Sequence, residues 1–285
     1  MLALGYDAIA IVSMIDIIYE DEDILVINKP SGLLVHGDGH NCEETLADLL
    51  LDTGKVTRDV GEPLIIPIRK DIVAACALPS HEYIFSKDST PEKPAGELHI
   101  HRPGIVHRLD KDTSGVMIIA KNTETFLALK KEFQERTMKK EYVAIVRGSF
   151  KENIGSISVP IGRSKNDFRK WLSGRGTRGE LRDAVTDYRV LGTFRTDDST
   201  QWSMILIKPR TGRTHQIRVH MKHTNHPVGG DKLYGDDKTI TAFPRLMLHA
   251  FRLSFGGKDG KPRVFEAPAP AEFKDAADLA SIDIT

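Results

Sequence analysis

The stretch HRLDKDTSG, residues 107–115, places the carboxylate of Asp110 between two cations and leads directly into the apolar run 116–120. A buried or half-buried aspartate is unfavourable unless nearby positive charge and hydrogen bonds keep it ionised. The pattern therefore fits a turn that holds one charged aspartate in place at the start of a buried strand. These residues alone leave a second interpretation open, in which Asp110 or Asp112 only caps the turn before Gly115.

A second dense motif, RTGRTHQIRVH at residues 210–220, lies far along the chain and is followed by Gly229-Gly230-Asp231. Together the two segments resemble the RluA-like pseudouridine synthases. Three shorter motifs match the same family in order along the chain: NKPSGL at 28–33, KEYV at 140–143 and LHA at 248–250. The resemblance extends over residues 16–272.

The resemblance implies both a fold and a reaction. Members of this family have an α+β catalytic domain and convert uridine in RNA to pseudouridine without a cofactor or a metal ion. By position, the catalytic residues are Asp110, its arginine partner Arg218 and the active-site tyrosine Tyr142. The resemblance also implies substrate contacts at Arg108, which would fill the gap left by a flipped base, and at Ile217, Arg213, His215 and Lys29.

The expected reaction detaches a uracil from its sugar, rotates it and rejoins it through carbon. An aspartate suits this chemistry because it can attack as a nucleophile or stabilise a sugar cation from the same position. Pairing with Arg218 would keep Asp110 charged and fix its rotamer. Attack on the sugar, attack on the base and stabilisation of a glycal all stay open.

Length and composition limit the class of protein. The chain has 285 residues with 40% hydrophobic content, which suffices for one large domain or two modest ones. Two cysteines are too few for a disulfide framework, and the first residues lack the basic leader of a secretion signal, so we expect a cytoplasmic protein. No apolar run is long enough to span a membrane. The formal net charge of zero argues against coating of nucleic acid through bulk positive charge.

Basic residues nevertheless gather in the run 163–182, which contains Arg163, Lys165, Arg169, Lys170, Arg175, Arg178 and Arg182. Glycines within this run predict a mobile loop, and Trp171 and Phe168 offer rings for stacking on bases. Because each neutralised phosphate releases counterions, we expect the run, and Arg175 and Arg178 in particular, to bind RNA. The lysines around residues 130–140 fit a solvated surface instead.

Hydrophobic patterning predicts most of the elements. Apolar runs predict strands at 24–27, 116–120, 142–146, 184–190 and 202–207. Helical spacing predicts helices at 43–51 and 123–136. For 215–223 the alternation alone would fit a strand, and it is the family resemblance that favours a helix. Many strands, few long helices and no regular repeat predict an α+β fold on a mixed, largely antiparallel sheet with flanking helices.

We expect one catalytic domain at 16–272, with an N-terminal extension at 1–15 and a C-terminal tail at 273–285. Residues 52–98 contain five prolines, which predict an insertion or extended loop rather than a packed element. Family members reach the motif at 107–115 sooner, so this segment is where the chain departs from the family pattern.

Four histidines, at positions 215, 220, 223 and 226, allow a competing interpretation as a metal site. Their spacings match no common zinc motif and no cysteine pair lies near them, so we expect no metal. A second alternative is a non-catalytic RNA-binding protein, which the joint presence of Asp110, Tyr142 and Arg218 opposes.

The expected partner is RNA, bound by a monomer. A ribosomal target in the large subunit is favoured over a transfer RNA, because the block RPGIV at 102–106 resembles that branch of the family. The sequence leaves open which uridine is the target.

Overall fold

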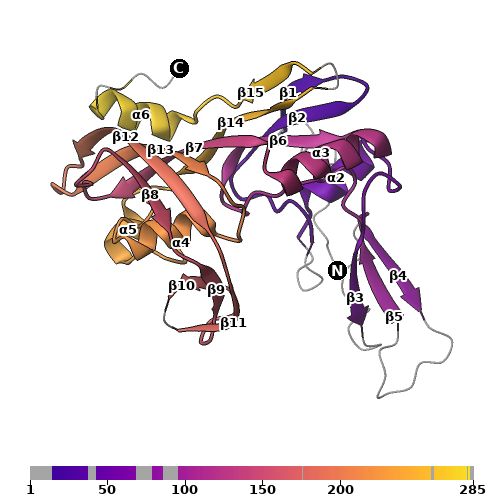
Figure 1. Cartoon of the computed structure of the whole chain (residues 1–285), viewed down its shortest axis with the longest axis horizontal. Coiled ribbons are helices and arrows are strands. Elements are labelled where there is room, and N and C mark those ends of the chain that lie inside the picture. The colour runs from indigo at the N-terminus through magenta and orange to yellow at the C-terminus, as the bar shows by residue number, and fades with distance from the viewer. Residues whose placement is uncertain are drawn as a thin grey trace, which may run out of the picture. The chain divides into compact units, whose positions relative to one another are not determined.

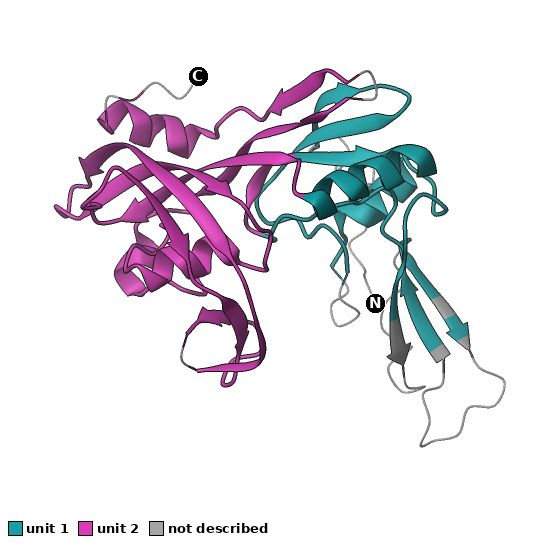
Figure 2. Ribbon diagram, viewed as in Figure 1, with its two compact units in different colours: residues 1–111, 117–135 teal, residues 112–116, 136–285 magenta. Residues whose placement is uncertain are grey.

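A computed structural model describes residues 15–37, 43–68, 79–85, 96–174, 176–257, 260–280 and 282. The chain divides into two compact units (Figure 2), and the expectation of one catalytic domain at 16–272 stays a prediction. The first unit comprises residues 1–111 and 117–135, and the second comprises 112–116 and 136–285. Strand β6, Ser114–Ala120, is shared, because its first residues belong to the second unit and the rest belong to the first.

The first unit contains the strands β1 (Asp16–Glu20) and β2 (Ile24–Lys29), which neighbour β6 in the order β1-β2-β6 (Figure 1). The apolar residues 24–27 of β2 and all of β6 are buried, which confirms both predicted strands. The predicted helices are confirmed as α2 (Leu46–Asp52) and α3 (Thr123–Glu135). Helix α2 begins after Thr45, whose hydroxyl accepts the backbone N–H of Asp48, as a capping residue does.

The prediction of an extended loop at 52–98 is wrong for the residues that form strands, while residues 69–78 and 86–95 lie outside the described residues. Three strands form a separate sheet in the order β3-β5-β4: β3 (Leu64–Ile68), β4 (His81–Phe85) and β5 (Gly96–Ile100). Pro67 lies within β3, an edge strand of this sheet. An edge strand tolerates proline because one of its sides forms no ladder hydrogen bonds, so the prolines misled the prediction.

The larger sheet of the second unit has the order β6-β14-β7-β13-β12-β8, with β15 paired to β14. Its strands are β7 (Lys139–Arg147), β8 (Ile154–Ser158), β12 (Val185–Arg195), β13 (Gln201–Pro209), β14 (Leu248–Gly256) and β15 (Pro262–Glu266). Strand β14 pairs with β6 in parallel and with β7 and β15 in antiparallel orientation. The sheet is therefore mixed and largely antiparallel, as predicted.

Gly115 allows β6 and β14 to approach each other just after the motif at 107–115. Its φ is +119°, and a Cβ at this position would lie 2.2 Å from the carbonyl oxygen of Ala250. Only glycine fits such a contact without a shift of the backbone.

Helices α4 (Gln216–His223), α5 (Asp237–Thr241) and α6 (Ala271–Ala280) complete the second unit. In Figure 1, α6 lies on one side of β12 and β13, and α4 and α5 lie on the other. The buried residues Phe273, Ala276 and Ala277 of α6 join the core around Trp202 and Met204. The predicted boundary at 272 therefore falls inside a packed helix. No helix in the described part of the chain has the length and hydropathy needed to cross a membrane.

The basic run 163–182 forms a small sheet rather than the predicted mobile loop. Its strands, in the order β10-β9-β11, are β9 (Ile161–Ser164), β10 (Trp171–Ser173) and β11 (Thr177–Arg182). Gly174 and Gly176 both have a φ of +86°, so they provide the reversal between β10 and β11. Arg175, between them, lies outside the described residues.

Candidate active site

The loop that carries Asp110 is anchored on both sides within the first unit. Leu109 is buried, Asp110 is half-buried, and the carbonyl of Lys111 accepts two hydrogen bonds. One comes from the backbone N–H of Gly32 at 2.9 Å and the other from Nζ of Lys29 at 3.0 Å. The loop after β2 thus holds the peptide that follows the predicted catalytic aspartate.

Lys29 is fully buried, and its ammonium group serves the backbone of the first unit. Besides the carbonyl of Lys111, Nζ donates to the carbonyls of Pro30 and Leu33, both at 2.8 Å. A buried ammonium needs such acceptors because burial otherwise disfavours its charge. These contacts support a role in holding the Asp110 loop, and the predicted contact between Lys29 and substrate stays a prediction.

The residues around Asp110 differ in exposure. Arg108 is exposed, which leaves its guanidinium accessible to a nucleic acid. His107 stacks on Phe133 with 4.7 Å between ring centroids, and its Nε2 accepts the backbone N–H of Ile118 at 3.1 Å. Lys111 forms a surface salt bridge with Glu43 at 2.5 Å. His107 is therefore a structural residue, while Arg108 is presented outward.

The far end of the motif is fixed in the second unit by a chain of buried hydrogen bonds. Arg245 donates from Nη2 to the hydroxyl of Ser114 at 2.6 Å, and that hydroxyl lies 2.8 Å from Nδ1 of His249. Nε2 of His249 lies 3.2 Å from the carbonyl oxygen of Ala267. Burial lowers the pKa of His249 to about 4, so the neutral ring accepts from Ser114 and donates to Ala267.

Gln216 fixes the start of α4, which carries Ile217 and Arg218. Its Oε1 accepts from the hydroxyl of Thr211 at 2.7 Å and from the backbone N–H of Arg213 at 3.0 Å. Its Nε2 donates to the carbonyl of Val185 at 2.9 Å and to the hydroxyl of Thr186 at 3.0 Å. The amide thereby ties the loop before α4 to the start of β12.

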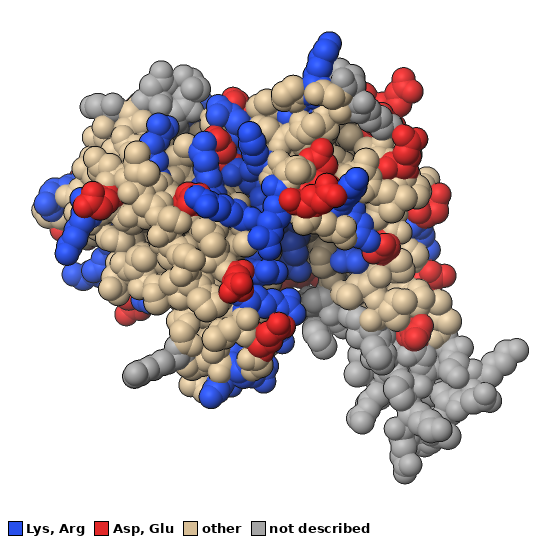
Figure 3. Space-filling model, viewed as in Figure 1, with Lys and Arg blue, Asp and Glu red and all other residues tan. Residues whose placement is uncertain are grey.

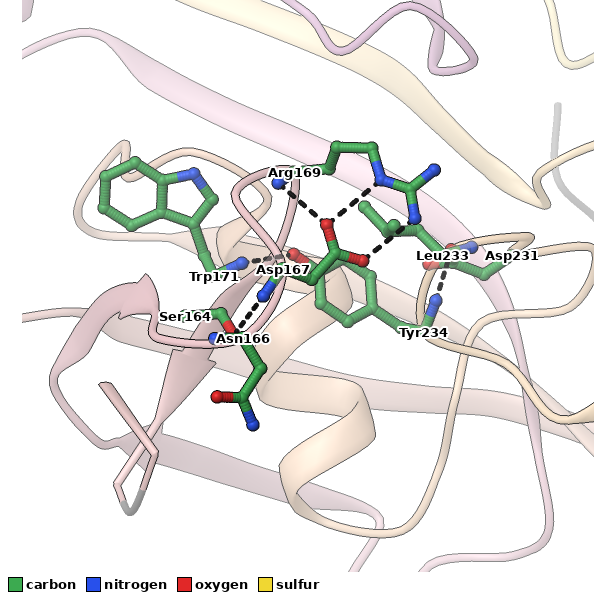
Figure 4. Close-up of polar contacts among 8 residues, drawn as sticks. All are labelled: Ser164, Asn166, Asp167, Arg169, Trp171, Asp231, Leu233 and Tyr234. Atoms are coloured by element: carbon green, nitrogen blue, oxygen red, sulfur yellow. Dashed lines mark hydrogen bonds and ion pairs between the residues drawn. The ribbon is translucent and has the colours of Figure 1, made fainter. Parts of the chain in front are cut away.

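Arg218 is held by a buried, bidentate ion pair with Asp231. Nε and Nη2 each donate to one carboxylate oxygen at 2.8 Å, and Asp231 is fully buried. Burial alone would raise the pKa of Asp231, but the hydrogen bonds and charge of Arg218 lower it below its usual value. The backbone N–H groups of Leu233 and Tyr234 add to this effect, as Figure 4 shows. Asp231 therefore stays ionised and fixes the plane of the guanidinium.

Tyr142 and Ile217 adjoin the same apolar core of the second unit. Tyr142 is half-buried on β7, and Ile217 is 6% exposed on α4. Lys140 lies on the same face of β7 as Tyr142, two residues before it. Burial lowers the pKa of Lys140, and the positive charge of Arg136 lowers it further by a smaller amount. Asp110 belongs to the first unit and Tyr142, Ile217 and Arg218 belong to the second, so their predicted assembly into one site stays a prediction.

The small sheet β10-β9-β11 presents several basic side chains to solvent. The exposed ones are Arg163, Lys165, Arg169, Arg178 and Arg182. Figure 3 shows basic side chains, with some acidic ones among them, over the end of the second unit where this sheet lies. The ring of Phe168 is 73% exposed, while Trp171 is half-buried under the guanidinium of Arg163 at 5.4 Å. Phe168 is thus the ring that a base could reach.

Arg213 and His215 lie next to this sheet in the second unit. Nε of the half-buried Arg213 donates to the carbonyl of Asp183 at 3.1 Å, so its guanidinium is fixed beside the end of β11. Nδ1 of His215 lies 2.8 Å from the hydroxyl of Tyr234. Their predicted contacts with substrate, like those of Arg178, stay predictions.

Two other histidines of the competing metal interpretation, His220 and His226, have protein partners. His220 is buried, with Nδ1 2.9 Å from the hydroxyl of Thr186 and Nε2 2.9 Å from the carbonyl oxygen of Val159. Nδ1 of His226 lies 2.8 Å from the carbonyl oxygen of Arg147. Across the described ranges, no group of three or more His, Cys, Asp or Glu is arranged to hold a metal ion.

Comparison with known families accounts for the two motifs. The family model described as RNA pseudouridylate synthase matches residues 23–223, a range that includes parts of both units. The chain belongs to the RNA pseudouridylate synthase family. The matched range contains the loop of Asp110, strand β7 with Tyr142, and helix α4 with Arg218. The resemblance to this family that the sequence shows is therefore confirmed.

Similar proteins span most of this chain. "Ribosomal large subunit pseudouridine synthase D" of Borreliella burgdorferi is 36% identical over 259 residues, which cover 91% of this chain and 66% of that protein. An uncharacterized RNA pseudouridine synthase of Aquifex aeolicus is 36% identical over 269 residues, which cover 91% of this chain and 71% of that protein. The chain thus spans about two thirds of the length of the Borreliella relative.

A solved structure of the family has the same fold. The human RNA pseudouridylate synthase domain containing 1 superposes with a TM-score of 0.64 at 26% sequence identity. The superposition covers 94% of this chain and 86% of that one. The α+β fold on a mixed sheet is thereby confirmed.

Sequence reasoning missed the residues that hold Arg218 and its helix. Asp231 follows the second motif but gave no sign of being the ion-pair partner of Arg218. The roles of Gln216 and Tyr234 were also missed, because some of their hydrogen-bond partners lie up to 63 residues away in the chain. The pair of glycines before Asp231 marks a tight turn, and this signal could have pointed to Asp231 as a structurally important residue.

Proposed function

We propose that this protein is an RNA pseudouridine synthase with Asp110 as its catalytic aspartate. The observation that carries the proposal is the family match over 23–223, which includes the Asp110 motif. Two further observations support it: the loop of Asp110 is anchored by Lys29 and Gly32, and the guanidinium of Arg218 is oriented by Asp231.

In the proposed reaction no atom is gained or lost by the RNA chain. The bond between C1′ of the sugar and N1 of uracil breaks, the base rotates, and C1′ bonds to C5. The proton on C5 is then removed, and N1 gains a proton. Asp110 would stabilise or trap the sugar or base between these steps, and Tyr142 is placed by the family pattern to pack on the base and accept the C5 proton.

A uridine within a folded RNA must leave its stack before it can react. Flipping costs a few kcal/mol, so a group that occupies the vacated space favours the flipped state. The exposed guanidinium of Arg108, two residues before Asp110, is suited to stack there and to bind phosphate at once. Ile217 and Tyr142 would contact the flipped base.

We propose large-subunit ribosomal RNA as the substrate, in preference to transfer RNA. Support comes from the names of relatives in Borreliella burgdorferi and Xanthomonas campestris, both called ribosomal large subunit pseudouridine synthase D. We further propose that the protein acts as a monomer in the cytoplasm, which light scattering and fractionation of the native host would test.

The deciding experiment maps pseudouridine by carbodiimide in total RNA from cells that lack this gene. The cells are complemented with the intact protein, with Asp110→Asn or with Asp197→Asn, a control at an exposed turn. We expect a modified uridine in large-subunit ribosomal RNA with the intact protein and the control, and none with Asp110→Asn. A pseudouridine only in transfer RNA would move the substrate to that class.

Asp110→Asn should abolish turnover while RNA affinity stays within a few-fold of the intact protein. The change preserves the shape of the side chain and removes only its charge. Single-turnover rates and binding isotherms on one transcript would measure both quantities. A variant with near-normal rate would overturn the role of Asp110, and RNA binding without turnover by the intact protein would favour a non-catalytic RNA-binding protein.

A further inference from the structure

The hydroxyl of Tyr234 joins the basic sheet to the helix that carries Arg218. Its oxygen accepts the backbone N–H of Trp171, in β10, at 2.9 Å (Figure 4). The same hydroxyl lies 2.8 Å from Nδ1 of His215, the residue before α4. Tyr234 is 5% exposed, so this junction lies within the second unit.

The ring of Tyr234 also contacts Arg218 directly. The guanidinium carbon of Arg218 lies 5.1 Å from the ring centroid, a cation–π contact. Asp231, which binds the same guanidinium, accepts the N–H groups of Leu233 and Tyr234 through Oδ1. One turn, residues 231–234, therefore supplies both the carboxylate and the ring that orient Arg218.

Backbone constraints fix this turn and the start of α4. Gly230 has a φ of +70°, and a Cβ there would lie 1.8 Å from the carbonyl oxygen of Arg245, so the chain is closely packed just before Asp231. His215 has a φ of 54°, a left-handed conformation that is unfavourable for a residue with a side chain. Its contact with Tyr234 helps to hold that conformation three residues before Arg218.

Hydrogen bonds within the turn connect the two strands of the hairpin of residues 161–173, which comprises β9, this turn and β10. The hydroxyl of Ser164 accepts the N–H groups of Asn166 and Asp167 at 3.2 and 3.3 Å. Asp167 pairs with Arg169 through Nε at 3.0 Å and Nη2 at 2.9 Å (Figure 4). RNA phosphates and bases that bind the exposed groups of this hairpin would act on the position of β10. In β10, the backbone N–H of Trp171 donates to the hydroxyl of Tyr234.

We propose that Tyr234 is a positioning residue that couples RNA bound at the hairpin 161–173 to the orientation of the Arg218 guanidinium. This inference rests on the proposed function and adds a specificity mechanism to it. An RNA that binds the hairpin fixes the position of the Tyr234 ring against the Arg218 guanidinium, and this RNA is turned over quickly. An RNA that binds without engaging the hairpin is turned over slowly.

A double-mutant cycle tests the coupling. Tyr234→Phe keeps the ring and removes only the hydroxyl, and the hairpin variant combines Lys165→Ala with Phe168→Ala. Single-turnover rates at saturating protein, and Kd values, are measured on an unmodified transcript of the host's large-subunit ribosomal RNA. Because the hydroxyl loses its hydrogen bonds to both Trp171 and His215, we expect Tyr234→Phe to lower the rate about tenfold with little change in Kd.

The decisive comparison is between single and combined variants. The hairpin changes should lower the rate in the intact background and have little further effect when Tyr234→Phe is present. Tyr188→Phe, which removes a hydroxyl from β12, is the matched control and should retain the full rate. Equal melting temperatures for Tyr234→Phe and the intact protein would show that folding is unchanged.

Three outcomes would overturn the coupling: rate effects that multiply independently, a normal rate for Tyr234→Phe, or a loss of affinity without loss of rate. In each of them the intact protein is active, so the proposed function stands. An intact protein that binds the transcript but leaves every uridine unchanged would instead overturn the proposed function, and the coupling with it.

Discussion

At the residue scale, the buried charged groups of Asp231 and Lys29 each have specific hydrogen-bond partners. Asp231 is fully buried and takes two hydrogen bonds from Arg218, and Lys29 is fully buried and donates to three carbonyls. Removal of one partner of such a group leaves charge in a medium that does not solvate it. Asp231 therefore holds the side chain of Arg218, and Lys29 holds the backbone of Lys111, next to Asp110.

Asp231→Asn should destabilise the protein and slow turnover. The change removes the negative charge that faces the Nε and Nη2 atoms of Arg218, and breaking a buried ion pair typically costs about 3–5 kcal/mol. Urea unfolding would measure the loss of stability. Glu180→Gln, at an exposed ion pair with Arg182, is the control and should leave the unfolding midpoint unchanged. A midpoint for Asp231→Asn equal to that of the control would contradict this account.

At the element scale, α6 belongs to the core of the second unit although it lies at the end of the chain. Phe273, Ala276 and Ala277 form its buried face, and Leu279 on the same helix is 65% exposed. An amphipathic helix of this kind is stabilised mainly by the face that it buries. Truncation at residue 272 would expose the core around Trp202.

Phe273→Ala should lower the free energy of unfolding by about 3–5 kcal/mol, the usual loss for a buried phenylalanine. Leu279→Ala is the matched control because it shortens a mostly exposed side chain of the same helix. Thermal and urea unfolding of both variants would measure the difference. Similar small effects from the two changes would show that α6 does not contribute to the core.

We expect RNA binding by the basic sheet β10-β9-β11 to depend on salt concentration. Arg178→Ala with Arg182→Ala should weaken RNA binding and lower the dependence of log Kd on log salt by about two, roughly one for each lost phosphate contact. Binding isotherms at several salt concentrations would measure the slope. Lys274→Ala, which removes an exposed positive charge from α6, should leave the slope unchanged. An unchanged slope for the double variant would place the RNA elsewhere.

At the scale of the whole molecule, the net charge is zero while cations gather on one small sheet. Two buried histidines make the stability depend on pH in mild acid. Burial lowers the pKa of His249 from 6.5 to about 4 and lowers that of His220 in the same direction. Both rings are neutral when folded and gain protons more readily when unfolded.

The free energy of unfolding should therefore fall as pH falls from about 6.5 to about 4, because the unfolded chain binds more protons in this window. His249 alone contributes roughly 3 kcal/mol to this loss, and its contribution is fully present above pH 6.5. Urea unfolding across the window would measure the slope, and His249→Gln should flatten it. A variant with the same slope as the intact protein would assign the pH dependence to other groups.

The sequence by itself determined the elements whose signal is local. Strands β2, β6, β7 and β13 each contain an apolar segment that the sequence shows, and α3 has apolar residues at helical spacing after a polar start. The motifs at 107–115 and 210–220 together were sufficient to indicate the family, because a dense order of polar residue types does not depend on tertiary contacts. For α4 the local pattern was ambiguous, because its alternation would also fit a strand, and the family resemblance predicted the observed helix correctly.

Only the tertiary structure decided how distant residues combine. Prolines and glycines suggested loops at 52–98 and 163–182, where edge strands and tight turns form sheets instead. The pairing of Arg218 with Asp231 and the three carbonyls around Lys29 follow from backbone paths that bring separate segments together. Local patterns record what a residue does to its own backbone, whereas burial and hydrogen-bond partners depend on the whole fold. The sequence therefore determined which functional side chains are available, and the fold decided which other residues hold those side chains in place.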